Sequence, residues 1–142
     1  MASGVYYSVA EDVAKGAIDF DTDTFYAMLV TSSYTPSPAH SKRSDITNEV
    51  SGTGYTSGGA EIAVSVSRSS GTTSITLGEV TWASPVSGFT ARRAIVYKRR
   101  GGASSADELV CCIDPGSGLA ANGAAFTLTP TSALTITTPS WS

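Results

Sequence analysis

The chain has 142 residues and a formal net charge of -3, with 41% hydrophobic and 15% charged residues. It is long enough for one domain with a buried core, and its charge content is too low for a disordered tail. The net negative charge argues against a general nucleic-acid binder, and no apolar run approaches the roughly 20 residues that span a bilayer. The composition also excludes the collagen-like, coiled-coil and disulfide-scaffold classes. We therefore expect a single domain over residues 1–142 that binds neither nucleic acid nor a membrane. The first residues contain no basic segment and no long apolar stretch, so no secretory signal is expected.

A short helix is predicted near the N-terminus. Ser8 and Glu11 have the spacing of a capping box, in which each side chain accepts a hydrogen bond from an unpaired backbone N–H. Gly16 then supplies a helix stop. A helix of about two turns must be held by packing, and the residues near one face at spacings of four are Val9, Val13 and Ala17.

An aspartate-rich segment follows at residues 19–23. Alternating carboxylates can ligate calcium, but the calcium-loop template requires Gly at its sixth position and Glu at its twelfth. Thr24 and Val30 occupy those positions. We therefore favour a turn in which the aspartates accept hydrogen bonds from local backbone N–H groups, and no metal or other cofactor is expected.

The most apolar strand is predicted over residues 24–31, and its two faces are both apolar. Both faces should therefore be covered, one by the core and the other by the N-terminal helix or a neighbouring subunit. A long connection over about residues 32–59 comes next, and Pro36 and Pro38 exclude regular ladder pairing there. Loops of this length within a compact domain are usually functional or bound to a partner.

The remainder of the chain is typical of short strands with turn residues between them. Ser69–Gly71 and the Asn122–Gly123 pair are turn signals. About eight strands in all predict an all-β protein, an antiparallel β-sandwich or barrel. From residue 60 onward, the expected strands cover residues 62–66, 75–77, 80–82, 90–98, 109–113, 126–128 and 134–136.

Cys111 and Cys112 are adjacent in an apolar run. Neighbouring side chains of a strand point to opposite faces, so a disulfide between the two is not expected. Two small buried thiols fit a protein that folds in a reducing cytoplasm.

Catalytic signatures are missing from the sequence. His40 is the only histidine and lies in a polar loop, where a catalytic role would need a nucleophile and an orienting carboxylate. The neighbouring carboxylates of Asp107 and Glu108 are expected to be solvated charges at a strand edge. We therefore expect a protein that is not an enzyme.

Basic residues concentrate in one place. Five of the nine basic side chains belong to Arg92, Arg93, Lys98, Arg99 and Arg100. Arginines among apolar strand residues either extend to the solvated rim or pair at an interface. Two interpretations remain open: a solvated strand end, or a contact with an acidic protein surface.

Several segments resemble small virion proteins of tailed bacteriophages. The matching blocks are GAIDFDTDT at 16–24, LVTSSYTP at 29–36, NEVSGTGYTSGG at 48–59, VTW at 80–82 and TARRAIVY at 90–97. Their order and spacing, over about residues 5 to 130, carry the resemblance. The Cys111–Cys112 pair and the basic residues at 98–100 lie outside this pattern.

The resemblance implies a capsid decoration (cement) protein, a class whose members are often jelly rolls. The implied fold is an antiparallel β-sandwich of about eight strands, jelly-roll-like, with a short N-terminal helix. The implied partner is the outer surface of the major capsid protein lattice, whose head it would stabilise. The protein would then be made in the host cytoplasm and reside on the virion, and would self-associate as a dimer or, less favoured, a trimer.

Candidate contact residues are the five basic side chains above together with Tyr34 and Tyr55. The 32–59 connection and the N-terminal residues are expected to lie over neighbouring capsid subunits and to become ordered on binding. Two other functions remain open: a virion protein associated with the tail or a fibre, and a carbohydrate-binding module. The latter requires exposed aromatic side chains, for which the candidates are Trp82, Tyr55 and Tyr97.

Overall fold

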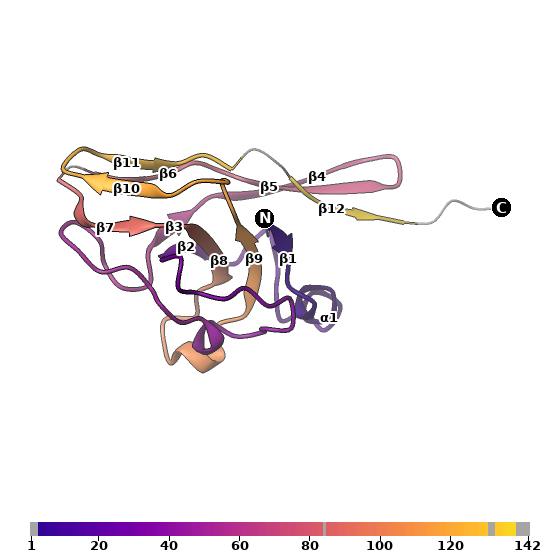
Figure 1. Ribbon diagram of the computed structural model, residues 1–142. Helices are drawn as coiled ribbons and strands as arrows, with labels where there is room; N and C mark the ends of the chain where they lie inside the picture. Colours follow the sequence, from indigo (N-terminus) through magenta and orange to yellow (C-terminus); the bar gives the residue numbers. More distant parts are fainter. Residues whose placement is uncertain (1–2, 84, 131–132, 139–142) are drawn as a thin grey trace.

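The protein is built from short antiparallel strands with one short α-helix, as seen in a computed structural model that describes residues 3–83, 85–130 and 133–138 (Figure 1). The helices are α1 (Ser8–Ala14) and the 3-10 turns η1 (Arg43–Asp45) and η2 (Ser104–Ala106). The strands are β1 (Gly4–Val5), β2 (Phe25–Val30), β3 (Ala60–Ile62), β4 (Val64–Ser69), β5 (Thr72–Leu77), β6 (Val80–Trp82), β7 (Ser87–Ala91), β8 (Arg93–Lys98), β9 (Leu109–Ile113), β10 (Leu119–Asn122), β11 (Phe126–Leu128) and β12 (Leu134–Thr137).

Nested antiparallel pairing organises the second half of the chain. Strand β8 pairs with β9, β7 with β10, β6 with β11, and β5 with β12. The strands from β5 to β8 therefore pair, in reverse order, with the strands from β9 to β12, so that the two halves form one long folded hairpin. This pairing is the arrangement of a jelly roll, and the predicted all-β antiparallel sandwich is confirmed.

Two layers enclose the core (Figure 1). One is a five-stranded sheet in the order β1-β9-β8-β2-β3, and the other contains the pair β11-β6 and the three-stranded sheet β12-β5-β4; in the further pair, β10-β7, β10 lies beside the second layer and β7 lies below it, at the level of β3 (Figure 1). Trp82 packs edge-on against Phe126 at a ring distance of 5.7 Å and is 5% exposed. Trp82 is therefore a core residue, and the expected burial of the unbridged Cys111 and Cys112 is confirmed.

Strand β2 is covered on both faces, as its sequence predicted. The cover comes from the same chain. The guanidinium of Arg43 in η1 lies 5.1 Å from the ring centre of Tyr97, a neighbour of β2 in the sheet. Tyr6 donates its backbone N–H to the carbonyl oxygen of Val110 on β9, which follows β8 in the sheet, and the ring of Tyr6 is buried.

Helix α1 lies where it was predicted, but it begins differently. Its N-cap is Tyr7, in helical conformation, and no described side chain caps the helix. Ser8 Oγ is buried and has no hydrogen-bond partner among the residues that the structure describes, so the predicted capping box is wrong. Gly16 follows the helix with a φ of +76°, which confirms its role as a stop.

The strand predicted over residues 90–98 is two strands. Strand β7 ends at Ala91 and pairs with β10, whereas β8 begins at Arg93 and pairs with β2 and β9. Arg92 lies at the break, where its backbone N–H donates to the carbonyl of Val30. At this break the chain passes from one sheet to another. The residue pattern over 90–98, which predicted a single strand, could not indicate this change of sheet.

The 32–59 connection packs on its own domain. It contains η1 and isolated bridges from Lys42 to Glu108 and from Thr53 to Ser87. Its side chains include Val50, which is 4% exposed. The expectation that this connection becomes ordered only on a partner is therefore corrected, because its contacts lie within the chain.

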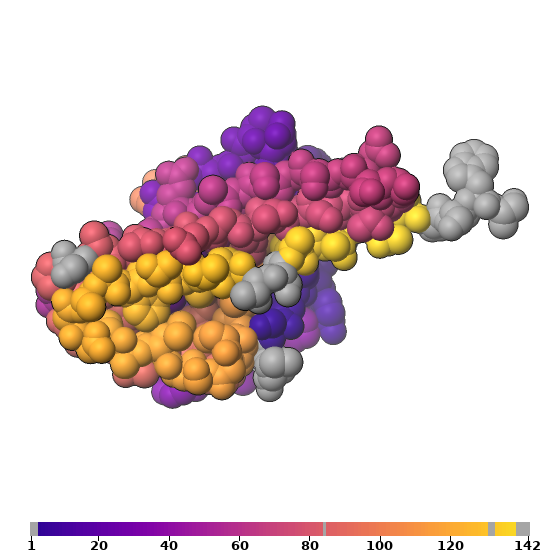
Figure 2. All heavy atoms as spheres, turned by 90° about the horizontal axis from the view of Figure 1, so that it is seen from above, coloured from indigo at the N-terminus to yellow at the C-terminus, as the bar shows by residue number. Residues whose placement is uncertain are grey.

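Strands β4, β5 and β12 form a projecting arm with two chemically different faces. In Figure 2, seen from above, this arm extends beyond the rest of the described molecule. The paired registers place only Ser and Thr on one face: Ser65, Ser67, Ser69, Thr72, Ser74, Thr76, Thr135 and Thr137. The other face carries Val64, Val66, Ile75, Leu77, Leu134 and Ile136, with Thr73 and Arg68 toward the tip.

One close approach in the fold is predicted to require glycine. Gly59 has a φ of +84°, and a Cβ added there would lie 1.9 Å from the carbonyl oxygen of Ala27. Gly59→Ala should lower the free energy of unfolding by about 3 kcal/mol, because backbone strain and overpacking add. Gly101 has a similar φ of +86° but no atom within 4 Å of such a Cβ, so Gly101→Ala should cost only about 1 kcal/mol. Equal losses in urea denaturation would contradict this prediction.

Candidate interaction surfaces

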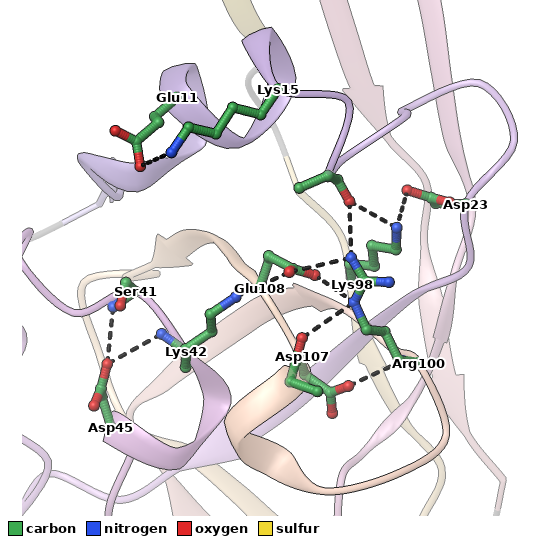
Figure 3. Close-up of polar contacts among 12 residues, drawn as sticks. Glu11, Lys15, Asp23, Ser41, Lys42, Asp45, Lys98, Arg100, Asp107 and Glu108 are labelled. Atoms are coloured by element: carbon green, nitrogen blue, oxygen red, sulfur yellow. Dashed lines mark hydrogen bonds and ion pairs between the residues drawn. The ribbon is translucent and has the colours of Figure 1, made fainter.

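Two neighbouring carboxylates hold the C-terminal part of the basic segment. Glu108 accepts hydrogen bonds from Lys42 Nζ at 2.9 Å and from Arg100 Nε at 2.9 Å (Figure 3). Asp107 accepts from Arg43 Nε at 2.8 Å and from the backbone N–H of Arg100. Burial alone would raise the pKa of Glu108, but the hydrogen bonds from Arg100 and Lys42 outweigh it and lower that pKa.

The prediction that Asp107 and Glu108 are solvated charges at a strand edge is therefore wrong. Asp107 is fully buried and Glu108 is 4% exposed. Their cations come from a segment more than sixty residues earlier in the chain as well as from the adjacent turn. Buried carboxylates need such partners, because an unpaired charge away from water is costly.

A third buried carboxylate holds the beginning of the basic segment. Asp114 forms ion pairs with Arg92 and Arg93 and accepts a hydrogen bond from the backbone N–H of Gly116. Its backbone exchanges hydrogen bonds with the hydroxyl of Ser3. The two arginines thus connect the break between β7 and β8 to the end of β9.

Lys98 and Arg99 also have internal contacts. Lys98 Nζ lies 2.8 Å from an Asp23 carboxylate oxygen and donates to the carbonyl oxygen of Ala17 (Figure 3). The Arg99 guanidinium lies 4.4 Å from the ring centre of Tyr26. Contacts within the chain therefore engage most of the basic side chains of this segment, which the sequence analysis had placed either at a solvated strand end or against an acidic protein surface. Arg99 and Arg100 are the exposed members of the segment.

Tyr34 is a core residue. It is 2% exposed, and its hydroxyl hydrogen-bonds to the Tyr6 hydroxyl at 3.1 Å and to His40 Nδ1 at 2.9 Å. Burial raises the pKa of Tyr34. The prediction that Tyr34 contacts a partner is corrected, because its ring and hydroxyl are both occupied inside the domain.

Tyr55 is half-buried and lies at the centre of the hydrogen bonds and ring contacts of the glycine-rich segment at residues 48–59. It donates to Glu49 Oε2 at 2.6 Å and accepts from the backbone N–H of Leu29. Its ring packs against Trp82 and Phe89. Burial, followed by the hydrogen bond to Glu49, raises the pKa of Tyr55.

The aspartate-rich segment forms the local turn that the sequence favoured. Asp19 accepts hydrogen bonds from the backbone N–H of Asp21 and the hydroxyl of Thr22. The Thr22 hydroxyl, followed by the Asp21 N–H, lowers the pKa of Asp19. Within the described ranges, no group of three or more His, Cys, Asp or Glu side chains is placed to hold a metal ion.

Exposed apolar side chains mark two surfaces, one within the N-terminal residues and the 32–59 connection, which the sequence analysis expected to lie over the capsid, and one on the arm, which it missed. One, the N-terminal patch, consists of Val5, Tyr7, Pro36 and Pro38; Tyr7 is 74% exposed and Val5 43%. A hollow of about 180 Å³ lies beside it, and β1 is the edge strand of its sheet. The alternation of small polar and apolar residues could have revealed the other surface, which lies on the arm.

The arm surface is the wall of a groove. Val66 is 43% exposed and Ile136 44%. Together with Ile75 they face Val13, Gly16 and residues 18–21 across a space of about 610 Å³. Both views show the arm overhanging the N-terminal part of the chain (Figures 1 and 2).

Comparison with protein-family models, with curated proteins and with solved structures finds no match for this chain. Among the described residues, no helix has the length and apolar character needed to cross a membrane.

The lowered pKa of Glu108 predicts a pH-dependent contribution to stability. As the pH falls, the unfolded carboxyl takes up its proton before the folded one, so this contribution is present near neutrality and is lost through the folded pKa. Glu108→Gln should lower the free energy of unfolding by about 2 kcal/mol at pH 7, and the difference should shrink below roughly pH 4. The exposed Glu61 on β3 provides the control Glu61→Gln. Denaturation at several pH values checks this, and a loss that stays constant with pH would contradict it.

Proposed function

We propose that this protein is a non-catalytic structural component of a phage particle, a capsid decoration protein that binds the outer surface of the major capsid protein lattice and stabilises the head. The resemblance of its sequence blocks to small virion proteins motivates the choice of particle. The distribution of exposed apolar surface supports an adhesive role.

One observation carries the adhesive role. Among the described residues, the large hydrophobic side chains that are strongly exposed are confined to the N-terminal patch and the arm: Val5, Tyr7, Val66 and Ile136. Most basic side chains, in contrast, are paired inside the molecule. Apolar patches beside polar surroundings are typical of protein–protein contacts.

The N-terminal patch is the surface that we assign to the shell. Tyrosine is enriched at binding hot spots, since it adds a large apolar area and a hydroxyl at low entropic cost. Tyr7 is held in place because its backbone N–H donates to the Pro38 carbonyl at 2.9 Å. A standard interface buries roughly 1,600 Å² in total, and many symmetric copies on one shell reinforce one another.

The burial of the candidate aromatics disfavours a carbohydrate-binding function. Trp82 and Tyr97 are 5% and 1% exposed, and Tyr55 packs between Trp82 and Phe89. Their ring faces are occupied by side chains of the same domain.

The proposal predicts binding to heads that assemble without this protein. Purified full-length protein should sediment with such heads, and the decorated heads should release their DNA at a higher temperature. Tyr7→Ser should weaken binding about tenfold, as expected for a hot-spot residue. Ala124→Ser, in the exposed turn between β10 and β11, should leave binding unchanged.

Three outcomes would contradict the proposal. In the first, electron microscopy of the particle finds this chain on the tail or a fibre. In the second, the chain is missing from the purified particle. In the third, heads bind the Tyr7→Ser variant as tightly as the parent protein, which would remove the N-terminal patch from the shell contact.

A further inference from the structure

We propose that His40 is a pH-sensitive switch for the N-terminal patch. Its neutral imidazole completes a network of hydrogen bonds that holds the turn to which Tyr7 is bonded, and its protonation breaks that network. The switch is a property of the free domain. Its consequence for binding, release of the protein from the shell at mildly acidic pH, rests on the proposed function.

The first argument is the connection between His40 and the patch. Residues 37–40 form a turn in which the backbone N–H of His40 donates to the Ser37 carbonyl at 3.1 Å. Pro38, the second residue of this turn, belongs to the patch, and its carbonyl accepts the backbone N–H of Tyr7 at 2.9 Å. His40 is therefore the last residue of the turn that fixes Tyr7, and a displaced His40 side chain weakens the support of the patch.

The second argument is the number of hydrogen atoms in the network, which consists of His40, Tyr34 and Tyr6. The Tyr34 hydroxyl lies 2.9 Å from His40 Nδ1 and 3.1 Å from the Tyr6 hydroxyl. Neither hydroxyl has a further partner among the residues that the structure describes. When neutral His40 carries its proton on Nε2, Tyr34 donates to Nδ1 and Tyr6 donates to Tyr34. The two contacts then hold the two hydroxyl hydrogens.

Protonation of His40 adds a hydrogen that the network cannot accommodate. Nδ1 becomes a donor, so three hydrogens compete for two contacts, and one of them is left without an acceptor. The tyrosine hydroxyls keep their hydrogens, because burial raises the pKa of both Tyr6 and Tyr34. Tyr6 and Tyr34 are only 4% and 2% exposed. A hydroxyl buried without a hydrogen-bond partner is destabilising, so the charged imidazole favours leaving the network.

The third argument is that the charged imidazole has an alternative partner. Asp45 in η1 accepts hydrogen bonds from the backbone N–H groups of Ser41 and Lys42 (Figure 3). These bonds, and after them the nearby charge of His40, lower the pKa of Asp45. The Asp45 carboxylate is therefore ionised when His40 takes up its proton, and it attracts the imidazolium away from Tyr34. A switch needs two such competing arrangements.

The other titratable groups beside the network keep their charge where histidine changes its own. Arg93 on β8 is paired with Asp114. Cys111 and Cys112 on β9 lie near the tyrosines, and burial raises the pKa of both thiols. His40 is the only histidine of the sequence. Between about pH 7.5 and pH 5.5, His40 is therefore the described group of this network that changes its charge.

Amide hydrogen exchange of the free full-length protein, followed by NMR, tests the switch. The protection of the Tyr7 amide, corrected for the intrinsic effect of pH on exchange, should fall about tenfold from about pH 7.5 to pH 5.5, because the unpaired hydroxyl destabilises the closed turn. The Tyr6 amide is the internal control. It donates to Val110 within the sheet, and its protection should change little.

Two variants should fix the switch in opposite states. His40→Asn places an amide oxygen near the position of Nδ1, where it accepts from Tyr34 and takes up no proton, so the Tyr7 amide should stay protected at both pH values. Tyr34→Phe removes the hydroxyl that holds His40, so the protection should be low at both. An unchanged Tyr7 protection in the parent protein, equal losses at Tyr6 and Tyr7, or a parent-like pH dependence in either variant would overturn the inference.

Phage heads separate the switch from the proposed function. Binding of the parent protein to heads, measured by sedimentation, should weaken about tenfold over the same pH range, whereas binding of His40→Asn should change little with pH. Equal binding of the parent protein at both pH values would overturn the role of the switch in release. A parent protein that binds heads at neither pH would contradict the proposed function alone, and the exchange of the Tyr7 amide would still decide the switch.

Discussion

The pairing of strands β5 to β8 with strands β9 to β12 is the constraint on which the rest of the structure depends. Each pair fixes the register of the next, from the β8–β9 hairpin outward to β12. The inner pairs curl around the aromatic core near Trp82. The outermost pair, extended by β4, runs past that core and becomes the arm. The same ribbon therefore provides both the stable interior and the exposed apolar surface.

Three buried carboxylates stabilise this arrangement at the points where the chain changes sheet or direction. Asp114 holds Arg92 and Arg93 at the β7–β8 break, while Asp107 and Glu108 hold Arg43, Lys42 and Arg100 beside η1 and η2. Removing one partner of such a group leaves a buried charge unpaired, which costs more than the pair contributes. The basic segment is thus part of the architecture, and the adhesive surface that we propose lies elsewhere.

Local patterns in the sequence predicted the parts of the fold that depend on neighbouring residues. Alternation located β5, β6 and β11, an apolar run located β9, and apolarity on both faces located β2. Strand β10 was missed because residues 119–122 contain no β-branched side chain. The partners of Glu108 and the burial of Tyr34 depend on contacts between distant segments, and no spacing in the chain reports such contacts. Alternation along β4, β5 and β12 indicates an apolar face on each strand, but only the register shows that these faces lie side by side on the arm.

The central claim is that this domain acts by adhesion through the N-terminal patch and the arm. Hydrogen–deuterium exchange of the protein, free at low concentration and bound to phage heads, tests that claim most directly. In the free protein β2, β8 and β9 should exchange slowest, since they are buried on both faces. Binding should add protection at residues 4–7 and in β4, β5 and β12. Added protection confined to the turns around residues 99–106 and 115–118, or none at all, would contradict the account.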